Sequence, residues 1–344
     1  MDSRLMAQNK VTSAEVAARA GVSQSAVSRV FTPGASASAK TVEKVRTAAA
    51  ELGYRPNVLA RAMVSGRSRI IGLVVAYLEN QFYPVALELL SNALQAKGYH
   101  ILIFTAPNST DGIDSVLQDL MDYQVDGIVA ASVSMSSDLA ARARSAGIPV
   151  VLFNRGQNGE GFSNVTSNNV LGGAKVAEFL MAGGHERIAH IAGWQGSSTG
   201  RDRQEGFVTA LEAAGVEPFD VLEGMYKRDI AMAAARSLVD RTDPADAIFV
   251  GNDHMAFAVM DAVRDAGMTP GRDISIVGYD DVPMASWGSY DLTTLRQPVN
   301  RMVDATVETL IDQIEKPAGK PGLFEIEGQL VVRSSARIPE GWTQ

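Results

Sequence analysis

Side chains that could hold a small polar molecule follow several apolar segments between residues 70 and 281. They are aromatics, amides, carboxylates and arginines, a mixture suited to stacking on a polyhydroxylated molecule and hydrogen-bonding its hydroxyls. Any one of them fits an ordinary loop residue or helix cap equally well, so it is their recurrence that favours a binding site. They are Asn80, Phe82, Tyr83, Asn154, Arg155, Trp194, Ser197, Thr199, Arg203, Tyr226, Asn252, Asp253, Tyr279, Asp280 and Asp281.

Start and stop signals for two short helices lie close together near the amino terminus. Thr12 and Glu15 have the spacing of a capping box, which predicts a helix from Ser13. Gly21 supplies the left-handed residue that ends this helix, and Ser23 caps a second one. Two short helices joined by so tight a turn indicate a helix-turn-helix.

The second of these helices would lie in the major groove of DNA with its first residues toward the base edges. Gln24 and Ser25 would then read bases, and Arg29, one turn later, would reach a guanine or a phosphate. A third helix, capped by Ser38 and ending at Gly53, would complete the small core. The helical pattern by itself also fits a three-helix bundle without a role on DNA.

Strand-like apolar segments alternate with amphipathic helical patterns from residue 70 onward, which predicts βαβ units on parallel sheets. The pattern restarts near residue 188, so two successive α/β sets share this part of the chain. Such sheets bind ligands outside the carboxyl ends of their strands, and two facing sets make a cleft there. The expected strands are 70–76, 99–104, 127–131 and 150–153, which should be buried, and then 188–192, 221–226, 247–251 and 274–279. The expected helices include 84–97 and 115–123.

Charge is distributed unevenly along the 344 residues, a length that fits two domains and a sizeable core. The net charge is −8. Residues 1–69 carry 11 Lys and Arg against 4 Asp and Glu, a charge of +7, whereas the remainder carries 20 against 35, a charge of −15. A small basic segment on a large acidic one is typical of a DNA-binding module joined to a domain of another function.

The composition and motifs exclude several kinds of site and favour a soluble, cytoplasmic protein. The absence of cysteine excludes disulfides, thiolate metal sites and cysteine nucleophiles. No apolar run has the length of a signal peptide or a membrane span, so no membrane partner is expected. The four His residues lack metal spacing and evident nucleophile partners, and no dinucleotide or Walker motif occurs, so no catalytic residue, metal or cofactor is expected. An α/β enzyme stays the alternative class of protein, because the fold alone does not determine the function.

The segments VTSAEVAARAGVSQSAVSRVF and SAKTVEKVRTAAAELGYRPNVLARAM resemble the amino-terminal module of the LacI/GalR family of bacterial transcription repressors. The resemblance implies an all-α helix-turn-helix domain over residues 1–56 and a hinge helix over 57–66 that folds only on specific DNA. The residues expected to contact DNA are Thr12, Ser23, Gln24, Ser25, Ser28, Arg29, Ser36, Asn57, Ala60, Arg61 and Met63.

In this family the hinge helices of two subunits enter the minor groove together. Met63 holds the position of the apolar wedge, usually Leu, which opens the central base step. Ala60 would pack against the partner's hinge, and Asn57 and Arg61 would face phosphates. A wedge at the operator centre requires two hinges, so we expect a homodimer on a pseudo-palindromic site of double-stranded DNA. The tail SSARIPEGWTQ shows no apolar heptads, so a carboxyl-terminal tetramerisation coil is not expected.

Later segments resemble successive landmarks of the family's effector-binding core, which is itself similar to periplasmic sugar-binding proteins. They are NQFYP, GGHERIAHIAG, STGRDRQEGF, FVGNDHMAFAVMDAVRDAG, DISIVGYDDVP, LTTLRQP and LVVRSSAR. The resemblance implies a two-lobed, periplasmic-binding-protein-like α/β core with two parallel doubly wound sheets. It spans 67–344, with an amino-terminal lobe of about 67–164 and 297–325 and a carboxyl-terminal lobe of about 165–296 and 326–344.

The chain should cross between the lobes near 163–167, 292–297 and 325–330, and these crossings would form a hinge. The resemblance implies that the effector lies between the lobes. Arg203 would grip it from a helix start, and Asp280 would close the pocket. The full expected set is Phe82, Tyr83, Asn154, Arg155, Ser197, Thr199, Arg203, Tyr226, Asn252, Asp253 and Asp280.

Arg155 departs from the apolar or aromatic residue often found at its position in the family. Beside Arg203 it indicates a carboxylate or phosphate on the ligand, unless Asp253 and Asp280 neutralise both arginines. The expected effector is therefore a small polar molecule, a sugar, sugar acid or sugar phosphate. A corepressor-dependent regulator of the purine or nucleoside type stays an alternative, and the sequence leaves open whether the effector releases DNA or recruits it.

Overall fold

The computed structural model of the chain describes residues 11–32, 35–55, 67–75, 78–105, 110–133, 135–157, 159, 161–316 and 321–342. The chain divides into two compact units, Met1–Ser68 and Arg69–Gln344, here called unit 1 and unit 2. The expected hinge helix lies outside the described residues, and with it Asn57, Ala60, Arg61 and Met63.

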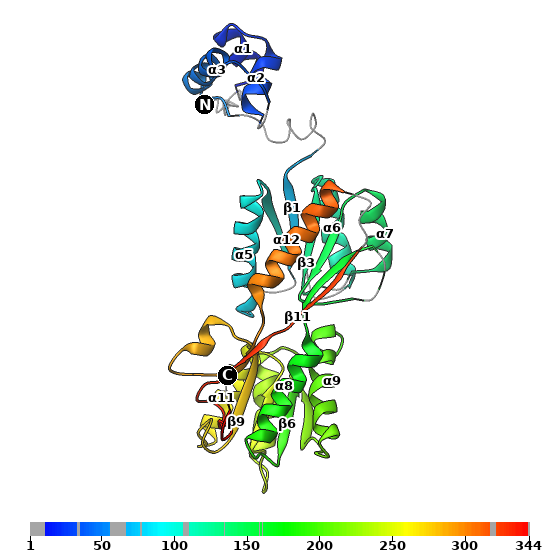
Figure 1. Ribbon diagram of the computed structural model, residues 1–344, viewed down its shortest axis with the longest axis vertical. Coiled ribbons are helices and arrows are strands. Elements are labelled where there is room, and N and C mark those ends of the chain that lie inside the picture. Colours follow the sequence, from blue (N-terminus) through cyan, green and yellow to red (C-terminus); the bar gives the residue numbers. More distant parts are fainter. Residues whose placement is uncertain are drawn as a thin grey trace, which may run out of the picture. The chain divides into compact units, whose positions relative to one another are not determined.

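The described residues of unit 1 form three short helices around a small apolar core (Figure 1). Thr12 and Glu15 form the expected capping box, with the Thr12 backbone N–H donating to Glu15 Oε2 over 2.7 Å. Each helix contributes a fully buried valine to the core: Val16, Val27 and Val45. The helices are α1 (Ser13–Ala20), α2 (Gln24–Phe31) and α3 (Ala39–Leu52).

Unit 2 contains two six-stranded sheets, one in each lobe. The amino-terminal lobe holds β1 (Ile70–Val75), α5 (Phe82–Ala96), β2 (His100–Thr105), α6 (Thr110–Asp122), β3 (Gly127–Ala131), α7 (Ser137–Ser145), β4 (Val150–Phe153), β5 (Ser163–Ser167), α12 (Val299–Glu315) and β11 (Leu323–Ile326). The carboxyl-terminal lobe holds α8 (Asn169–Ala182), β6 (Ile188–Ala192), α9 (Ser198–Ala213), β7 (Asp220–Glu223), α10 (Arg228–Val239), β8 (Ala247–Val250), α11 (Asp253–Asp265), β9 (Ser275–Asp280), the 3-10 helix η1 (Pro283–Ser286), β10 (Thr293–Arg296) and β12 (Gln329–Val331).

The strand order is β11-β5-β4-β3-β1-β2 in the first sheet and β12-β10-β9-β8-β6-β7 in the second. All pairs are parallel except the antiparallel pair of β10 and β12 at one edge. The expected two-lobed α/β core is thereby confirmed, with sheets that are mostly parallel where wholly parallel ones were expected.

Helices cover both faces of each sheet, because successive side chains of a strand point to opposite faces and both must be buried (Figure 1). In β1, Leu73 packs on the side of α5 and α12, and Val74 packs on the side of α6 and α7. In β9, Ile276 packs toward α10 and α11, and Val277 packs toward α8 and α9. This layering fixes the carboxyl ends of the strands, where the expected ligand residues lie.

The chain passes between the lobes three times. The first passage follows Ser167, because the whole of β5 pairs with strands of the amino-terminal sheet. The lobe boundary that was expected between residues 164 and 165 therefore falls inside β5. The second joins β10 to α12, which packs on β3, β4 and β5. The third lies between β11 and β12, which belong to different sheets.

Two expected strands are wrong in part. The segment 99–104 was expected to be a buried strand, but β2 is an edge strand whose Ile103 is 52% exposed. The segment 221–226 was expected to be a strand throughout, but β7 ends at Glu223, and Tyr226 lies in the next loop with a left-handed backbone at φ 58. Apolar composition does not distinguish an edge strand from a central one, since sheet order depends on distant pairings.

Candidate functional site

The turn between α1 and α2 is held by local hydrogen bonds. Gly21 adopts φ 65, and its N–H donates to the carbonyls of Ala17 and Ala18. Ser23 Oγ accepts the N–H of Ala26 over 3.3 Å, which caps α2. The hydroxyls of Thr12 and Ser23, both expected at DNA, therefore serve as helix caps, and both side chains stay at the surface.

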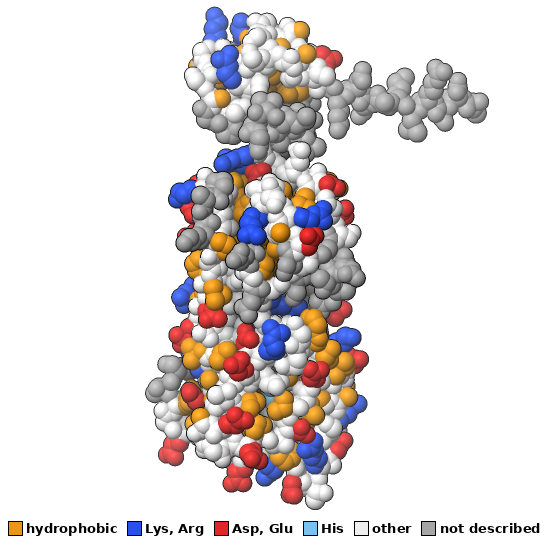
Figure 2. Space-filling view, turned by 90° about the vertical axis from the view of Figure 1, so that its right-hand side faces the viewer, with side chains coloured by type: hydrophobic (Ala, Val, Ile, Leu, Met, Phe, Trp, Pro, Cys, Tyr) orange, Lys and Arg blue, Asp and Glu red, His pale blue; other side chains and the backbone are white. Residues whose placement is uncertain are grey.

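The side chains expected to read DNA lie on one exposed face of α2. Gln24, Ser25, Ser28 and Arg29 are all exposed, and their spacing places them on adjacent positions of that face. Gln24 Nε2 donates to a serine hydroxyl of α1 over 2.8 Å, and Arg29 Nε donates to the Ser25 carbonyl over 3.4 Å. Ser36, between α2 and α3, is also exposed. Figure 2 shows both basic and acidic side chains at the surface of unit 1, and the visible face of unit 2 also carries both signs of charge.

Buried polar side chains from both lobes of unit 2 converge near the carboxyl ends of their strands. We call this set the interlobe cluster and define it as Tyr83, Asn154, Arg155, Thr199, Arg203, Tyr226 and Asp280. Seven of the residues expected at the effector thus come together.

The amino-terminal lobe contributes a hydrogen-bonded group to this cluster. Asn154 Nδ2 donates to the Tyr83 hydroxyl over 2.8 Å, and that hydroxyl also bonds Ser132. Burial raises the pKa of Tyr83, and the charge of Arg155 opposes this rise. The Arg155 guanidinium carbon lies 5.7 Å from the ring centre of Trp194 and 5.9 Å from that of Tyr226. Both rings belong to the other lobe, so Arg155 reaches across the cleft.

Arg203 is held by hydrogen bonds within its own, carboxyl-terminal lobe. Its Nε donates to Asn169 Oδ1 over 2.9 Å, and its Nη1 donates to the Gly251 carbonyl over 2.6 Å. Nη1 also lies 3.6 Å from Asp280 Oδ1, and the guanidinium carbon lies 3.6 Å from the ring centre of Tyr279. Burial disfavours the charged guanidinium, but Tyr226, Asp280 and two further tyrosines together outweigh burial and raise the pKa of Arg203.

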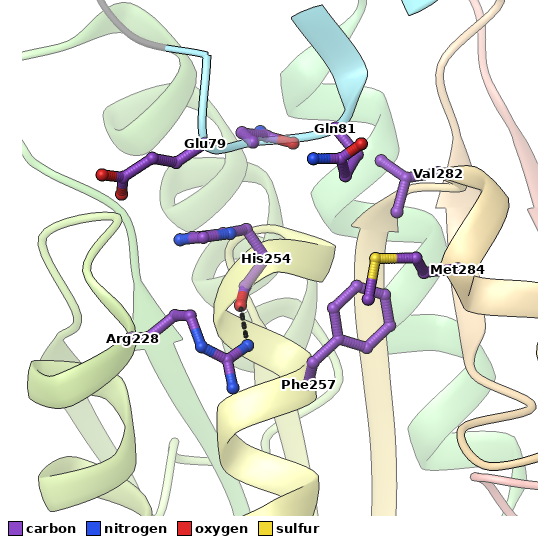
Figure 3. Close-up of a pocket in the computed structure, with 8 residues that line it drawn as sticks. Glu79, Gln81, Arg228, His254, Phe257, Val282 and Met284 are labelled. Atoms are coloured by element: carbon purple, nitrogen blue, oxygen red, sulfur yellow. Dashed lines mark hydrogen bonds between the residues drawn. The ribbon is translucent and has the colours of Figure 1, made fainter. Parts of the chain in front are cut away.

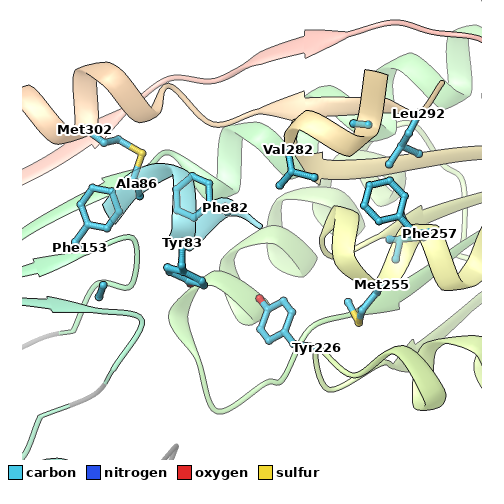
Figure 4. Packing of buried hydrophobic residues seen from close by; sticks show 14 of the residues in the cluster. Phe82, Tyr83, Ala86, Phe153, Tyr226, Met255, Phe257, Val282, Leu292 and Met302 are labelled. Atoms are coloured by element: carbon cyan, nitrogen blue, oxygen red, sulfur yellow. The ribbon is translucent and has the colours of Figure 1, made fainter. Parts of the chain in front are cut away.

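Tyr226 and its partners form the opposite side of the cluster. Thr199 Oγ1 lies 2.9 Å from the Tyr226 hydroxyl and 3.2 Å from Ser197 Oγ, and Ser197 caps α9. Figure 4 shows the Tyr226 hydroxyl pointing toward Tyr83 from the other lobe.

Asp280 ties the two lobes together at the end of β9. Its Oδ2 accepts Asn80 Nδ2 of the amino-terminal lobe over 3.0 Å, and its Oδ1 accepts Gln297 Nε2 over 2.7 Å. Its backbone has φ 126, a conformation that residues other than glycine seldom adopt. Burial raises the pKa of Asp280, whereas Arg203 and the two amides lower it.

Three expected ligand residues serve the fold instead of facing the cluster. Phe82 stacks on the core residue Phe153 at 6.2 Å between ring centres (Figure 4). Asn252 caps α11 through Oδ1, which accepts the N–H of a residue three positions on. Asp253 accepts the Val282 N–H over 2.9 Å and the Thr294 hydroxyl over 2.6 Å. Burial raises the pKa of Asp253, and nearby Asp280 adds to the rise.

Several partners of the cluster were absent from the expected set. Ser132 directly follows β3, an expected strand, so the rule that ligand residues follow strands would have found it. Gln297 follows β10, which was expected only as a crossing between the lobes, so the same rule could not find Gln297. Asn169 begins α8 and orients Arg203. No local pattern marks Asn169, because its role depends on where α9 packs.

A pocket of about 210 Å³ opens beside the cluster, between the loop of Glu79 and Gln81 and the carboxyl-terminal lobe (Figure 3). Its polar side includes His254, whose carbonyl accepts Arg228 Nη1 over 3.3 Å. Burial lowers the pKa of His254, and the charge of Arg228 lowers it further. The remaining lining residues are Asn80, Phe257, Val282 and Met284.

Within the described residues, no group of three or more His, Cys, Asp or Glu is arranged to hold a metal ion. The helices of the described part of the chain include none that is long and apolar enough to cross a membrane.

A small helix-turn-helix unit and a two-lobed core are the parts expected of a DNA-binding regulator. Residues 12–57 match the family described as bacterial regulatory proteins, lacI family, and residues 177–336 match the periplasmic binding protein-like domain. Among curated proteins, the HTH-type transcriptional regulator CelR of Thermobifida fusca is 33% identical over 330 residues, covering 93% of this chain and 96% of the relative. The HTH-type transcriptional repressor PurR of Photobacterium profundum is 28% identical over 326 residues, covering 94% and 98%.

Solved structures are similar over the same length. A lac repressor dimer bound to operator and the anti-inducer ONPF has a TM-score of 0.85 and 26% identity, covering 95% of this chain and 99% of that one. A CelR–cellobiose complex has a TM-score of 0.71 and 32% identity, covering 94% of this chain and 99% of that one.

The chain belongs to the lacI family of bacterial regulatory proteins. It is a transcriptional regulator with a DNA-binding helix-turn-helix unit and a periplasmic-binding-protein-like core, as the sequence resemblance implied.

Proposed function

We propose that this regulator is a cytoplasmic repressor that binds a pseudo-palindromic operator as a homodimer and responds to a small polar effector between its lobes. The observation that carries the proposal is the interlobe cluster, in which buried donors and acceptors of both lobes meet beside the aromatic rings of Trp194 and Tyr226. A ligand that contacts both lobes stabilises one lobe arrangement over the other, and that difference is what shifts an equilibrium.

The exposed face of α2 supports the DNA part of the proposal. Gln24, Ser25, Ser28 and Arg29 stand on a rigid, capped helix, as direct base readout requires. The likeness to a lac repressor dimer on its operator supports the dimer, and the likeness to a CelR–cellobiose complex supports a sugar-like effector. A planar corepressor of the purine or nucleoside type is the second candidate, because Trp194 and Tyr226 offer rings on which a base would stack.

Selection of duplexes from a random pool by the purified chain, at one fixed salt concentration, tests the DNA part. The wild-type chain should enrich an inverted repeat with two half-sites. The Arg29→Ala variant should bind that repeat about 10- to 100-fold more weakly, the range for loss of one good base contact. Arg236→Ala, which removes a surface arginine of α10, serves as the matched control and should bind normally. Enriched sequences without a repeat, or unchanged binding by Arg29→Ala, would contradict the proposal.

A further inference from the structure

Arg155 is a buried cation whose hydrogen-bonding capacity is largely unused. Its side chain is 3% exposed, and Nε and Nη1 have no hydrogen-bond partner among the described residues. No carboxylate of the described part of the chain lies within ion-pair distance of it. The rings of Trp194 and Tyr226, at 5.7 and 5.9 Å, stabilise a guanidinium only partly.

Arg203, by contrast, is already satisfied by Asn169, Gly251 and Asp280. The two acidic residues that could have neutralised both arginines are also committed. Asp280 is bonded to Asn80 and Gln297 and lies beside Arg203. Asp253 is bonded to backbone and hydroxyl donors elsewhere. Among the described residues of the interlobe cluster, Arg155 is therefore the arginine without a carboxylate partner.

An unused acceptor lies next to these unused donors. Asn154 Oδ1 is buried without a hydrogen-bond partner in the described residues, whereas its Nδ2 is held by Tyr83. A buried charge or amide without partners costs several kcal/mol unless another molecule supplies them. A ligand that matches these two residues would present anionic oxygens to the donors of Arg155 and a hydroxyl hydrogen to Asn154 Oδ1.

We propose, on the basis of the proposed effector site, that the ligand of the cleft is a hydroxylated carboxylate whose carboxylate binds Arg155 and whose adjacent hydroxyl donates to Asn154. One unpaired guanidinium balances one negative charge, which favours a carboxylate over a phosphate dianion. Sugar acids, in which a hydroxyl neighbours the carboxylate, have this pattern. Arg155 is thus the residue that selects acids over the corresponding neutral sugars.

Calorimetric titration of the full chain with matched pairs tests the assignment. The acids are D-gluconate and D-galactonate, whose 2-hydroxyl neighbours the carboxylate, and the comparison ligands are D-glucose, D-galactose, the neutral amide D-gluconamide and the sugar 6-phosphates. The wild-type chain should bind an acid about 100-fold more tightly than its neutral counterpart, because a site built for a polar group rejects analogues that lack it. Arg155→Gln should abolish that preference, and Arg201→Gln, which changes an exposed arginine on α9, should retain it.

Thermal unfolding without ligand provides a second readout. Removal of an unpaired buried charge should leave the midpoint of Arg155→Gln equal to or above that of the wild-type chain, whereas a merely structural arginine would lower it. Equal binding of acids and neutral sugars, tighter binding of phosphates, absence of acid binding, or a lowered midpoint would each overturn the assignment. If a neutral sugar binds and changes operator affinity, only the carboxylate assignment fails; if no ligand of the panel changes operator affinity, the proposed function fails.

Discussion

At the scale of single residues, the core beneath the cleft contains a histidine that is held neutral. His190 is fully buried, stacks on Phe249 at 4.6 Å and lies 5.3 Å from Phe207. Its Nδ1 lies 2.9 Å from the Phe249 carbonyl, which only accepts, so the proton of the neutral ring is on Nδ1. Burial, helped by the charge of Arg203, lowers the pKa of His190 to about 4, although the hydrogen bond to the Phe249 carbonyl opposes this fall.

This lowered pKa predicts a loss of stability in mild acid. Between about pH 6.5 and pH 4 the unfolded chain binds a proton at His190 that the folded chain does not, so stability falls as the pH falls. Urea unfolding at pH 7 and pH 5 should show a loss of about 2 kcal/mol from this residue. The loss should be smaller by that amount in His190→Gln but unchanged in His100→Gln, whose side chain is exposed. Equal losses in all three chains would show that His190 does not titrate as described.

At the scale of elements, the close packing of α8 and α9 positions Arg203. A Cβ atom at Gly173 would lie 2.2 Å from the Arg203 carbonyl oxygen, and one at Gly206 would lie 1.8 Å from the Val170 carbonyl oxygen. Only glycine therefore permits this crossing. The close approach in turn lets Asn169 at the start of α8 reach the Arg203 guanidinium.

Substitution of Gly206 by alanine should force α8 and α9 apart. Because the obstacle is backbone, we expect a destabilisation of about 1–3 kcal/mol, together with weaker ligand binding as Arg203 moves from Asn169. Chemical denaturation measures the first effect and calorimetry the second. Gly288→Ala is the matched control, since no heavy atom lies within 4 Å of its added Cβ. A Gly206→Ala chain as stable as this control would contradict the packing argument.

The elements also show what the sequence could and could not predict. Central strands such as β3, β4 and β6 have the expected bounds, because they are continuous apolar runs between helices. The polar strand β5 was expected only as a crossing, since Ser163–Ser167 shows no apolar pattern and gains its place by pairing with β4 and β11.

The candidate site was predictable to a similar degree. Residues after strands, such as Tyr83, Arg155 and Asp280, converge in the interlobe cluster. The pattern could not separate Asn252 and Asp253, which cap and brace local structure, from residues that face the cleft. That distinction depends on the direction of a side chain, which packing of distant elements determines.

At the scale of the whole of unit 2, direct hydrogen bonds hold the lobes together. Asn80 bonds Asp280, and the Gly156 N–H donates to Ser198 Oγ over 3.0 Å. The Ser167 and Tyr279 hydroxyls lie 3.3 Å apart near one of the three passages. A ligand that enters the cluster must part some of these contacts and replace them, so its binding changes the balance between open and closed lobes.

The most direct test of the account is the affinity of the full chain for its selected operator with and without a ligand that calorimetry shows to bind. The account predicts that a saturating sugar acid changes operator affinity at least about tenfold in the wild-type chain and in Arg201→Met, whose altered side chain is exposed. In Arg203→Met, which removes the cation bonded to Asn169 and Gly251, that change should be lost. Operator affinity that stays the same in the wild-type chain while the ligand is bound would contradict the claim that the cleft controls DNA binding.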